Sequence, residues 1–246
     1  METERLTHPL YPIYLYFMEC LGPAIIALSW YLLYRQGTGF EWVMLAILAV
    51  LSGSLTVKIP GINSKVSVAD AFIFANIILY GPAVGAITAI LDGLMVPNSS
   101  KSAKRKLHYK LFNVGVMALS AFAGGQAFSL AFGRVSPHQG PLPTLSHLFP
   151  PLIILATVYY LVNTGCVAAI VALEAKKNVY GIWRDRFRWI AINYYTAALI
   201  AGLLAFDRNA ITPIVVACIM VVLLVIHLSD RGYVKRFAES LKNSAP

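Results

Sequence analysis

The chain has 246 residues, of which 58% are hydrophobic and only 13% are charged, and its mean hydropathy is +0.68. Soluble domains average about 25% charged residues, so this composition excludes an ordinary soluble domain and predicts a multi-pass membrane protein. The net charge is +9, but no stretch reads as a soluble module with a basic groove, so we expect no nucleic-acid partner.

Apolar runs in chain order predict an all-α integral membrane protein. A spanning helix needs about 20 residues, and shorter helices are tolerated in a packed bundle. The predicted helical segments are 11–34, 40–57, 68–80, 83–96, 111–132, 149–173, 189–206 and 210–228. Segments three and four form either two short spans or one re-entrant hairpin, which gives a bundle of six to eight transmembrane helices. We expect one transmembrane domain, residues 1–228, followed by a short polar cytoplasmic tail, residues 229–246.

Basic residues alternate with neutral loops along the chain. They gather at 101–110, at 176–188 and in the tail, whereas the Pro-rich loop 133–148 carries only Arg134. Cytoplasmic loops are the ones enriched in Lys and Arg. This pattern predicts that both termini are cytoplasmic, and six or eight spans give the same result.

Two aspartates stand out, because Asp70 and Asp92 lie inside apolar runs at equal distances from a Gly81-Pro82 turn. Each is eleven residues from Gly81, or about 16 Å along a helix, so we expect both at similar depth near the cytoplasmic side. A carboxylate inside a membrane helix is costly and indicates a functional site. Two structural alternatives remain open: Ser67 or Asp70 caps the third segment, and Asp92 pairs with a lysine of 101–106.

Further polar residues lie inside the predicted spans. The candidate ligand-binding residues beside the two aspartates are Glu19, Asn76, Asn113, Asn163, Asn193 and Tyr194. A lone amide in a span usually makes an interhelical hydrogen bond, whereas burying the Glu19 charge costs more. Tyr194 and Tyr195 are candidates for an aromatic cage. The aromatic groups at 11–17 and 159–160 instead predict interfacial belts.

A stripe of small residues runs along the fourth segment at a spacing of four. Its members, with the proline of the turn, are Gly81, Pro82, Gly85, Ala89 and Gly93. In membranes such stripes let helix backbones approach closely. The stripe therefore predicts a helix-packing face, which is compatible with a helix pressed against a ligand.

Motifs for metal or enzyme chemistry are missing from the sequence. The three cysteines, Cys20, Cys166 and Cys218, lie in apolar segments without metal-type spacing, and no histidine pair has a helical ligand spacing. We find no phosphate loop and no serine nucleophile motif. We therefore expect no cofactor, no metal site and no enzymatic activity; a lipid-modifying enzyme would need Asp92 and a histidine such as His108 in one cavity.

A series of motifs runs from the stretch after the second predicted segment into the fifth: Ile59-Pro60-Gly61, Ser67, Asp70, Gly81-Pro82, Gly85, Asp92 and Leu111-Phe112-Asn113. This series resembles the MASE-type membrane sensor domains of bacteria, which precede GGDEF, HD-type phosphohydrolase or histidine-kinase modules. The resemblance implies a sensory module in the bacterial inner membrane. In that family an output domain follows the last span, whereas this sequence ends at Pro246, so we expect either a stand-alone relative or a sensor separated from its output domain.

The same Gly-Pro hairpin is similar, more weakly, to the substrate-binding S components of energy-coupling-factor transporters. That similarity rests on residues 68–95 and implies six spans, a ligand cavity and docking to a partner membrane protein. The leading hypothesis is a sensory or ligand-binding module that passes a signal to a cytoplasmic output domain or partner. The alternative is a transporter or its substrate-binding subunit. The expected partners are the lipid bilayer, a small amphipathic ligand, an effector protein and a second copy of the chain.

Overall fold

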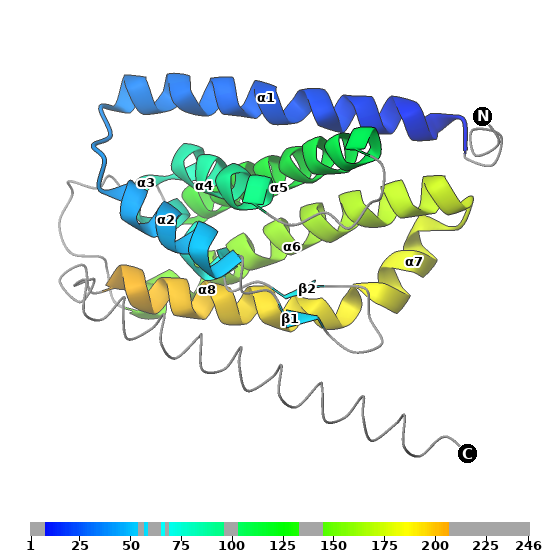
Figure 1. Cartoon of the computed structure of the whole chain (residues 1–246). Helices are drawn as coiled ribbons and strands as arrows, with labels where there is room; N and C mark the ends of the chain where they lie inside the picture. Colours follow the sequence, from blue (N-terminus) through cyan, green and yellow to red (C-terminus); the bar gives the residue numbers. More distant parts are fainter. Residues whose placement is uncertain are drawn as a thin grey trace, which may run out of the picture.

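The computed structural model describes residues 8–53, 57–58, 65–66, 69–95, 103–132 and 145–206. This part of the chain is a helical bundle (Figure 1). Its helices are α1 (Leu10–Gln36), α2 (Trp42–Gly53), α3 (Ala69–Tyr80), α4 (Pro82–Met95), α5 (Ala103–Phe132), α6 (Leu145–Ala175), α7 (Val179–Arg186) and α8 (Ala191–Phe206). The predicted eighth segment, 210–228, and the tail, 229–246, lie outside the described residues.

The all-helical prediction is confirmed, with corrections at several boundaries. Helix α5 begins at Ala103, inside the basic stretch that was predicted to be a loop, and α6 begins at Leu145, inside the predicted Pro-rich loop. Helix α6 runs through Pro150 and Pro151. Lysine and arginine disfavour a membrane span but are good helix formers, so α5 can extend through the basic stretch. Proline disfavours the interior of a helix without forbidding it.

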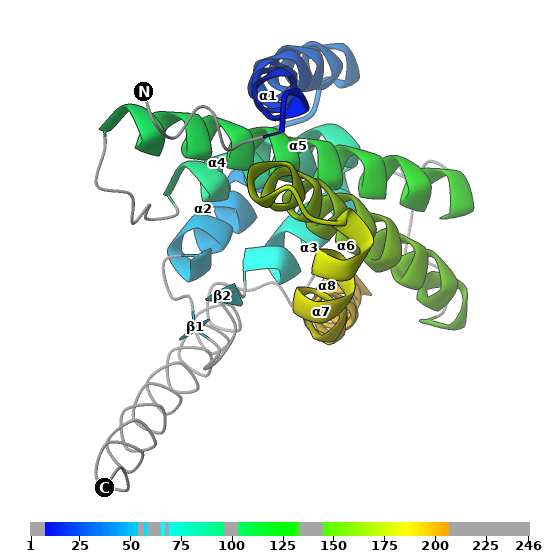
Figure 2. The ribbon, with the colours of Figure 1, turned by 90° about the vertical axis from the view of Figure 1, so that its right-hand side faces the viewer.

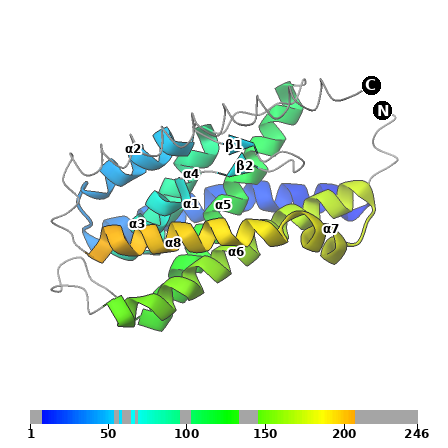
Figure 3. The same ribbon diagram turned by 90° about the horizontal axis from the view of Figure 1, so that it is seen from below.

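Helix α3 is the centre of the bundle. Every residue from Ala71 to Leu79 is buried, because α2, α4, α5 and α8 all pack around this helix. The sequence of α3 is apolar on all sides apart from Asp70 and Asn76, which is typical of a fully enclosed helix. Figures 1 and 2 show α1 and α8 on opposite sides of the bundle, with α5 and α6 between them, and in Figure 3, which is seen from below, α8 lies in front of α1.

Helices α3 and α4 form the predicted Gly-Pro hairpin. Gly81 has φ +93°, a left-handed conformation that glycine adopts without steric cost. An added Cβ at Gly85 would overlap the Ile77 side chain, and one at Gly125 of α5 would lie 2.8 Å from the Pro82 Cα. The lack of a side chain at Gly85 thus lets α4 approach α3 closely. The role of the whole small-residue stripe stays a prediction.

Helices α1 and α5 touch through their backbones. An added Cβ at Gly115 would overlap the Met18 carbonyl oxygen, and one at Gly22 would lie 3.2 Å from the Gly115 Cα. Such close approach is how small residues join helices in a membrane, where the lipid offers no hydrophobic drive for association. Figure 2 shows α1 lying over α5 in end view.

The described residues contain three helices that are long and apolar enough to cross a membrane: 10–36, 107–132 and 147–175. A fourth span arises if α7 and α8, which meet at a bend of 63°, count as one. Helices α2, α3 and α4 have only 12, 12 and 14 residues. The count of six to eight spans and the orientation of the termini therefore stay predictions.

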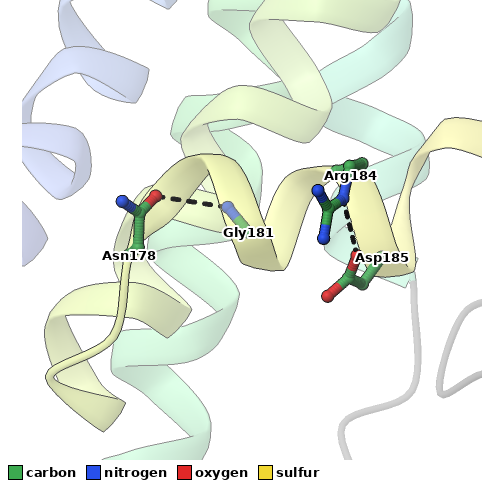
Figure 4. A network of polar contacts seen from close by, with 4 residues as sticks. All are labelled: Asn178, Gly181, Arg184 and Asp185. Carbon is green, nitrogen blue, oxygen red and sulfur yellow. Dashed lines mark hydrogen bonds and ion pairs between the residues drawn. The ribbon is translucent and has the colours of Figure 1, made fainter.

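Two short connections complete the described fold. Strands β1 (Val57–Lys58) and β2 (Lys65–Val66) pair antiparallel between α2 and α3, where no strand was predicted. The basic connection after α6 contains α7, whose first turn is capped by the Asn178 side chain accepting from the Gly181 amide at 3.2 Å (Figure 4). The adjacent Arg184–Asp185 pair is exposed, so it adds little stability.

Candidate functional site

Asp92 lies in the last turn of α4 and is only 3% exposed. Its Oδ1 atom is buried and has no hydrogen-bond partner among the described residues. This oxygen faces the carboxyl end of α2, where a Cβ added at Gly53 would overlap it. Because Gly53 has no side chain, the Asp92 carboxylate fits between α4 and α2.

Asp70 lies in the first turn of α3, where the helix dipole favours a negative charge. The Tyr159 hydroxyl of α6 donates a hydrogen bond to its Oδ1 at 3.2 Å. Asp70 is close enough to Asp92 for the two carboxylates to interact electrostatically. Asp70 and Asp92 thus lie at the ends of the hairpin away from its turn. Their predicted depth near the cytoplasmic side stays a prediction.

Tyrosines from two further helices complete this group. The Tyr159 ring packs edge-on against Phe74 of α3, with centroids 4.9 Å apart, and lies 5.5 Å from the ring of Tyr194 of α8. Tyr159 is fully buried and Tyr194 is 9% exposed. We call Asp70, Asp92, Tyr159 and Tyr194 the acid–tyrosine cluster; it joins α3, α4, α6 and α8.

The acid–tyrosine cluster lacks positive charge among the described side chains. Neither aspartate forms an ion pair there; the two ion pairs in this part of the chain are His108–Glu19 and Arg184–Asp185. Helices α2 and α4 both end beside Asp92, and a helix carboxyl end carries a partial negative charge. A buried carboxylate in such surroundings is costly unless a cation, a proton or a donor from a ligand satisfies it.

Asn76 does what a lone amide in a span is expected to do. Its Nδ2 donates to the Thr88 hydroxyl of α4 at 2.8 Å and to the Trp42 carbonyl at 3.4 Å. These bonds tie α3 to α4 and α2. Within the described segments the Asn76 Oδ1 is buried and has no hydrogen-bond partner.

Glu19 has a partner outside this cluster. Its Oε1 lies 2.8 Å from His108 Nδ1, and this contact joins α1 to the first part of α5. The Glu19 side chain is 10% exposed, so the pair is largely shielded from solvent. Glu19 thus joins two helices, and His108 contacts Glu19 rather than Asp92.

The other predicted residues lie apart. Asn113 donates to Met117 Sδ one turn along its own helix, at 3.6 Å, and Asn163 and Asn193 are half-buried. The prediction that Tyr159 and Tyr160 form an interfacial belt is wrong, since both are buried. The contact of the Tyr159 hydroxyl could not be predicted, because a tyrosine pair in an apolar run does not reveal which helix face turns inward.

Removing the Tyr159 hydroxyl should weaken the bundle. In Tyr159→Phe the ring and its packing on Phe74 remain, but the donor to Asp70 is lost. Hydrogen bonds to charged groups contribute about 1.5–3 kcal/mol, so we expect a loss of unfolding free energy in this range. The matched control is Tyr195→Phe, whose hydroxyl meets the neutral Thr157 hydroxyl at 3.0 Å and should matter less. Equal losses in denaturant titrations of the two variants would contradict the assignment.

Comparison with protein-family models, with curated proteins and with solved structures found no match for this chain. The resemblances described above therefore stay predictions.

Proposed function

We propose that this chain is a ligand-binding sensory module embedded in the bacterial inner membrane, with the acid–tyrosine cluster as its ligand site. The observation that carries the proposal is the Asp92 Oδ1 atom, which is buried and has no hydrogen-bond partner in the part of the chain that the structure describes. The neighbouring helices supply a second carboxylate and two tyrosines. A natural fold rarely leaves a buried carboxylate oxygen unsatisfied without a functional reason.

The positions of the cluster residues suggest a route by which ligand binding would be transmitted from the acid–tyrosine cluster to α8. A ligand at Asp92 engages the α3–α4 hairpin, and the same cluster includes Tyr194 of α8, the helix that leads along the chain toward residues 207–246. Signalling requires that the ligand bind two helix arrangements with different affinity. Because α8 packs on both α3 and α6, a change at the cluster is well placed to shift α8.

Large apolar side chains on the outside of the bundle support membrane embedding. They are exposed on α1, α2, α6 and α8, and include Ile13, Phe17, Trp30, Ile47 and Leu203. Outward apolar surface of this extent marks contact with lipid or with another membrane protein. The expected partners accordingly remain the bilayer, an effector protein and a second copy.

Native mass spectrometry of gently extracted protein tests the ligand site. We expect wild type to retain a small molecule or ion that the nearly isosteric Asp92→Asn variant loses. Glu19→Gln is the matched control, because it also neutralises a shielded carboxylate but lies outside the cluster. Retention by all three proteins, or by none, would contradict the proposed site.

A transporter or its substrate-binding subunit is the second candidate, and the same observation favours it, since an uncompensated carboxylate between helices can couple ion or substrate movement. Flux into proteoliposomes distinguishes the two. A transporter accumulates the retained molecule, whereas a sensor binds it without flux. An energising membrane partner encoded beside the chain would favour transport, and an effector module would favour sensing.

A further inference from the structure

We propose that the segment between α6 and α8, residues 176–188, binds the headgroups of anionic phospholipids at the membrane surface. This segment contains α7 and directly follows α6, which includes one of the three helical stretches long and apolar enough to cross a membrane. Chain that leaves the end of a spanning helix lies at the level of the lipid headgroups, because the hydrocarbon core ends there. This binding is separate from the ligand proposed for the acid–tyrosine cluster.

Positive charge is concentrated and exposed in residues 176–188. The exposed basic side chains are Lys176, Lys177, Arg184, Arg186 and Arg188. The same stretch of sequence has a single carboxylate, Asp185, which pairs with Arg184 at 3.0 Å. Positive charge therefore remains in large excess. Guanidinium groups match phosphate oxygens with two parallel hydrogen bonds, and clusters of basic residues beside a spanning helix are attracted to anionic lipids.

Two exposed apolar side chains lie among these charges, at the beginning of α7. Val179 is 43% exposed and Tyr180 is 65% exposed. A basic segment that met only water would gain nothing from an outward valine and tyrosine, whereas an amphipathic helix at a membrane surface buries such side chains. The Tyr180 ring stacks on Trp183 with centroids 6.4 Å apart, and both residue types favour the headgroup level. Charge and apolar contact together suit a phospholipid better than a soluble anion.

Helix α7 is fixed against α6. Ile182 is buried there, and the Trp183 indole N–H donates to the Thr164 hydroxyl of α6 at 2.9 Å. The Tyr160 hydroxyl donates to the Phe187 carbonyl at 3.3 Å, directly after α7. Topology alone requires basic residues in a loop but does not require that loop to be held in place. A fixed backbone presents its basic side chains in a constant arrangement, which lowers the cost of ordering on binding.

The basic first turns of α5 lie at the same end of the bundle. The Tyr109 hydroxyl of α5 donates to Glu174 Oε1 at 3.4 Å, which places these turns beside the end of α6. Residues 103–110 include four basic residues in their sequence. Figure 1 shows α7 at this end, where α1 begins, and the His8 amide donates to the Leu173 carbonyl there at 3.0 Å. One membrane surface therefore meets both basic segments.

The test counts lipids bound to the full-length protein in a neutral detergent. Phosphatidylglycerol, or phosphatidylcholine with the same acyl chains, is titrated in, and native mass spectrometry measures the bound lipid. We expect wild type to prefer phosphatidylglycerol. Combining Lys176→Gln, Lys177→Gln and Arg186→Gln should lower this preference at least ten-fold. The three side chains are exposed, so the fold should persist.

The matched control changes the same three positions but keeps their charge: Lys176→Arg, Lys177→Arg and Arg186→Lys. It should retain the preference for phosphatidylglycerol. If the neutralised triple variant does not fold, Lys176→Gln combined with Lys177→Gln takes its place, with a smaller loss expected.

Three results would overturn the proposal. Equal affinity of wild type for the two lipids would exclude recognition of the anionic headgroup. A preference that is unchanged in the neutralised variant would place the lipid site outside residues 176–188. An equal loss in the charge-retaining control would show that charge is not the cause. A small molecule lost from Asp92→Asn, without any lipid preference in wild type, would reject the lipid site while upholding the proposed function.

Discussion

Replacing Gly115 with alanine should destabilise the bundle by about 3 kcal/mol, the upper part of the range for overpacking. The added methyl group would overlap the Met18 carbonyl, and a backbone atom cannot move aside as a flexible side chain can. The α1–α5 pair must then separate, which also disturbs the Glu19–His108 contact between the same helices.

The control for this prediction is Gly165→Ala in α6, where an added Cβ would meet nothing within 4 Å. Alanine is about 1 kcal/mol more favourable than glycine inside a helix, so this variant should be unchanged or more stable. Denaturant titration in mixed micelles measures both. Similar losses in the two variants would show that the close α1–α5 approach is wrong.

Replacing Gly53 with alanine should disable the candidate site. The new methyl group would overlap Asp92 Oδ1, so either the carboxylate or the end of α2 must move. We expect a loss of about 2 kcal/mol of unfolding free energy. We also expect ligand retention to fall as far as it does in Asp92→Asn.

A double-mutant cycle isolates the cause of that loss. In an Asp92→Ala background the carboxylate is gone, so Gly53→Ala should cost close to nothing. Residues in direct contact show such non-additivity, whereas independent sites add. If the Gly53→Ala loss is the same in both backgrounds, the glycine serves the path of the α2 backbone and not the Asp92 carboxylate.

The helices and the hairpin could be predicted because their signals are local. Long apolar runs and the Gly81-Pro82 turn located α3 and α4 to within a residue or two at each end. The equal spacing of Asp70 and Asp92 from that turn placed them at the same end of the hairpin. A hairpin leaves no other arrangement, so this part of the site follows from sequence alone.

The rest of the site depends on which helix faces meet, and a single sequence does not contain that information. Helices α1, α5 and α6 are apolar around most of their circumference, so no periodicity marked Tyr159 as inward-facing or paired Glu19 with His108. Gly53 and Gly115 stood outside any repeated stripe. Their roles appear only when the neighbouring helix is in place.

The stability of Asp92→Asn in ligand-free protein tests the central claim most directly. The claim is that no protein cation balances Asp92, whereas a structural ion pair with a lysine of 101–106 would balance it. Breaking a buried ion pair costs about 3–5 kcal/mol, while removing an unpaired buried charge relieves a desolvation penalty. Measured by thermal unfolding in N-methylglucamine chloride, the variant should therefore be at least as stable as wild type. A lower unfolding midpoint for Asp92→Asn under these conditions would mean that a lysine holds Asp92 and that the cluster is structural.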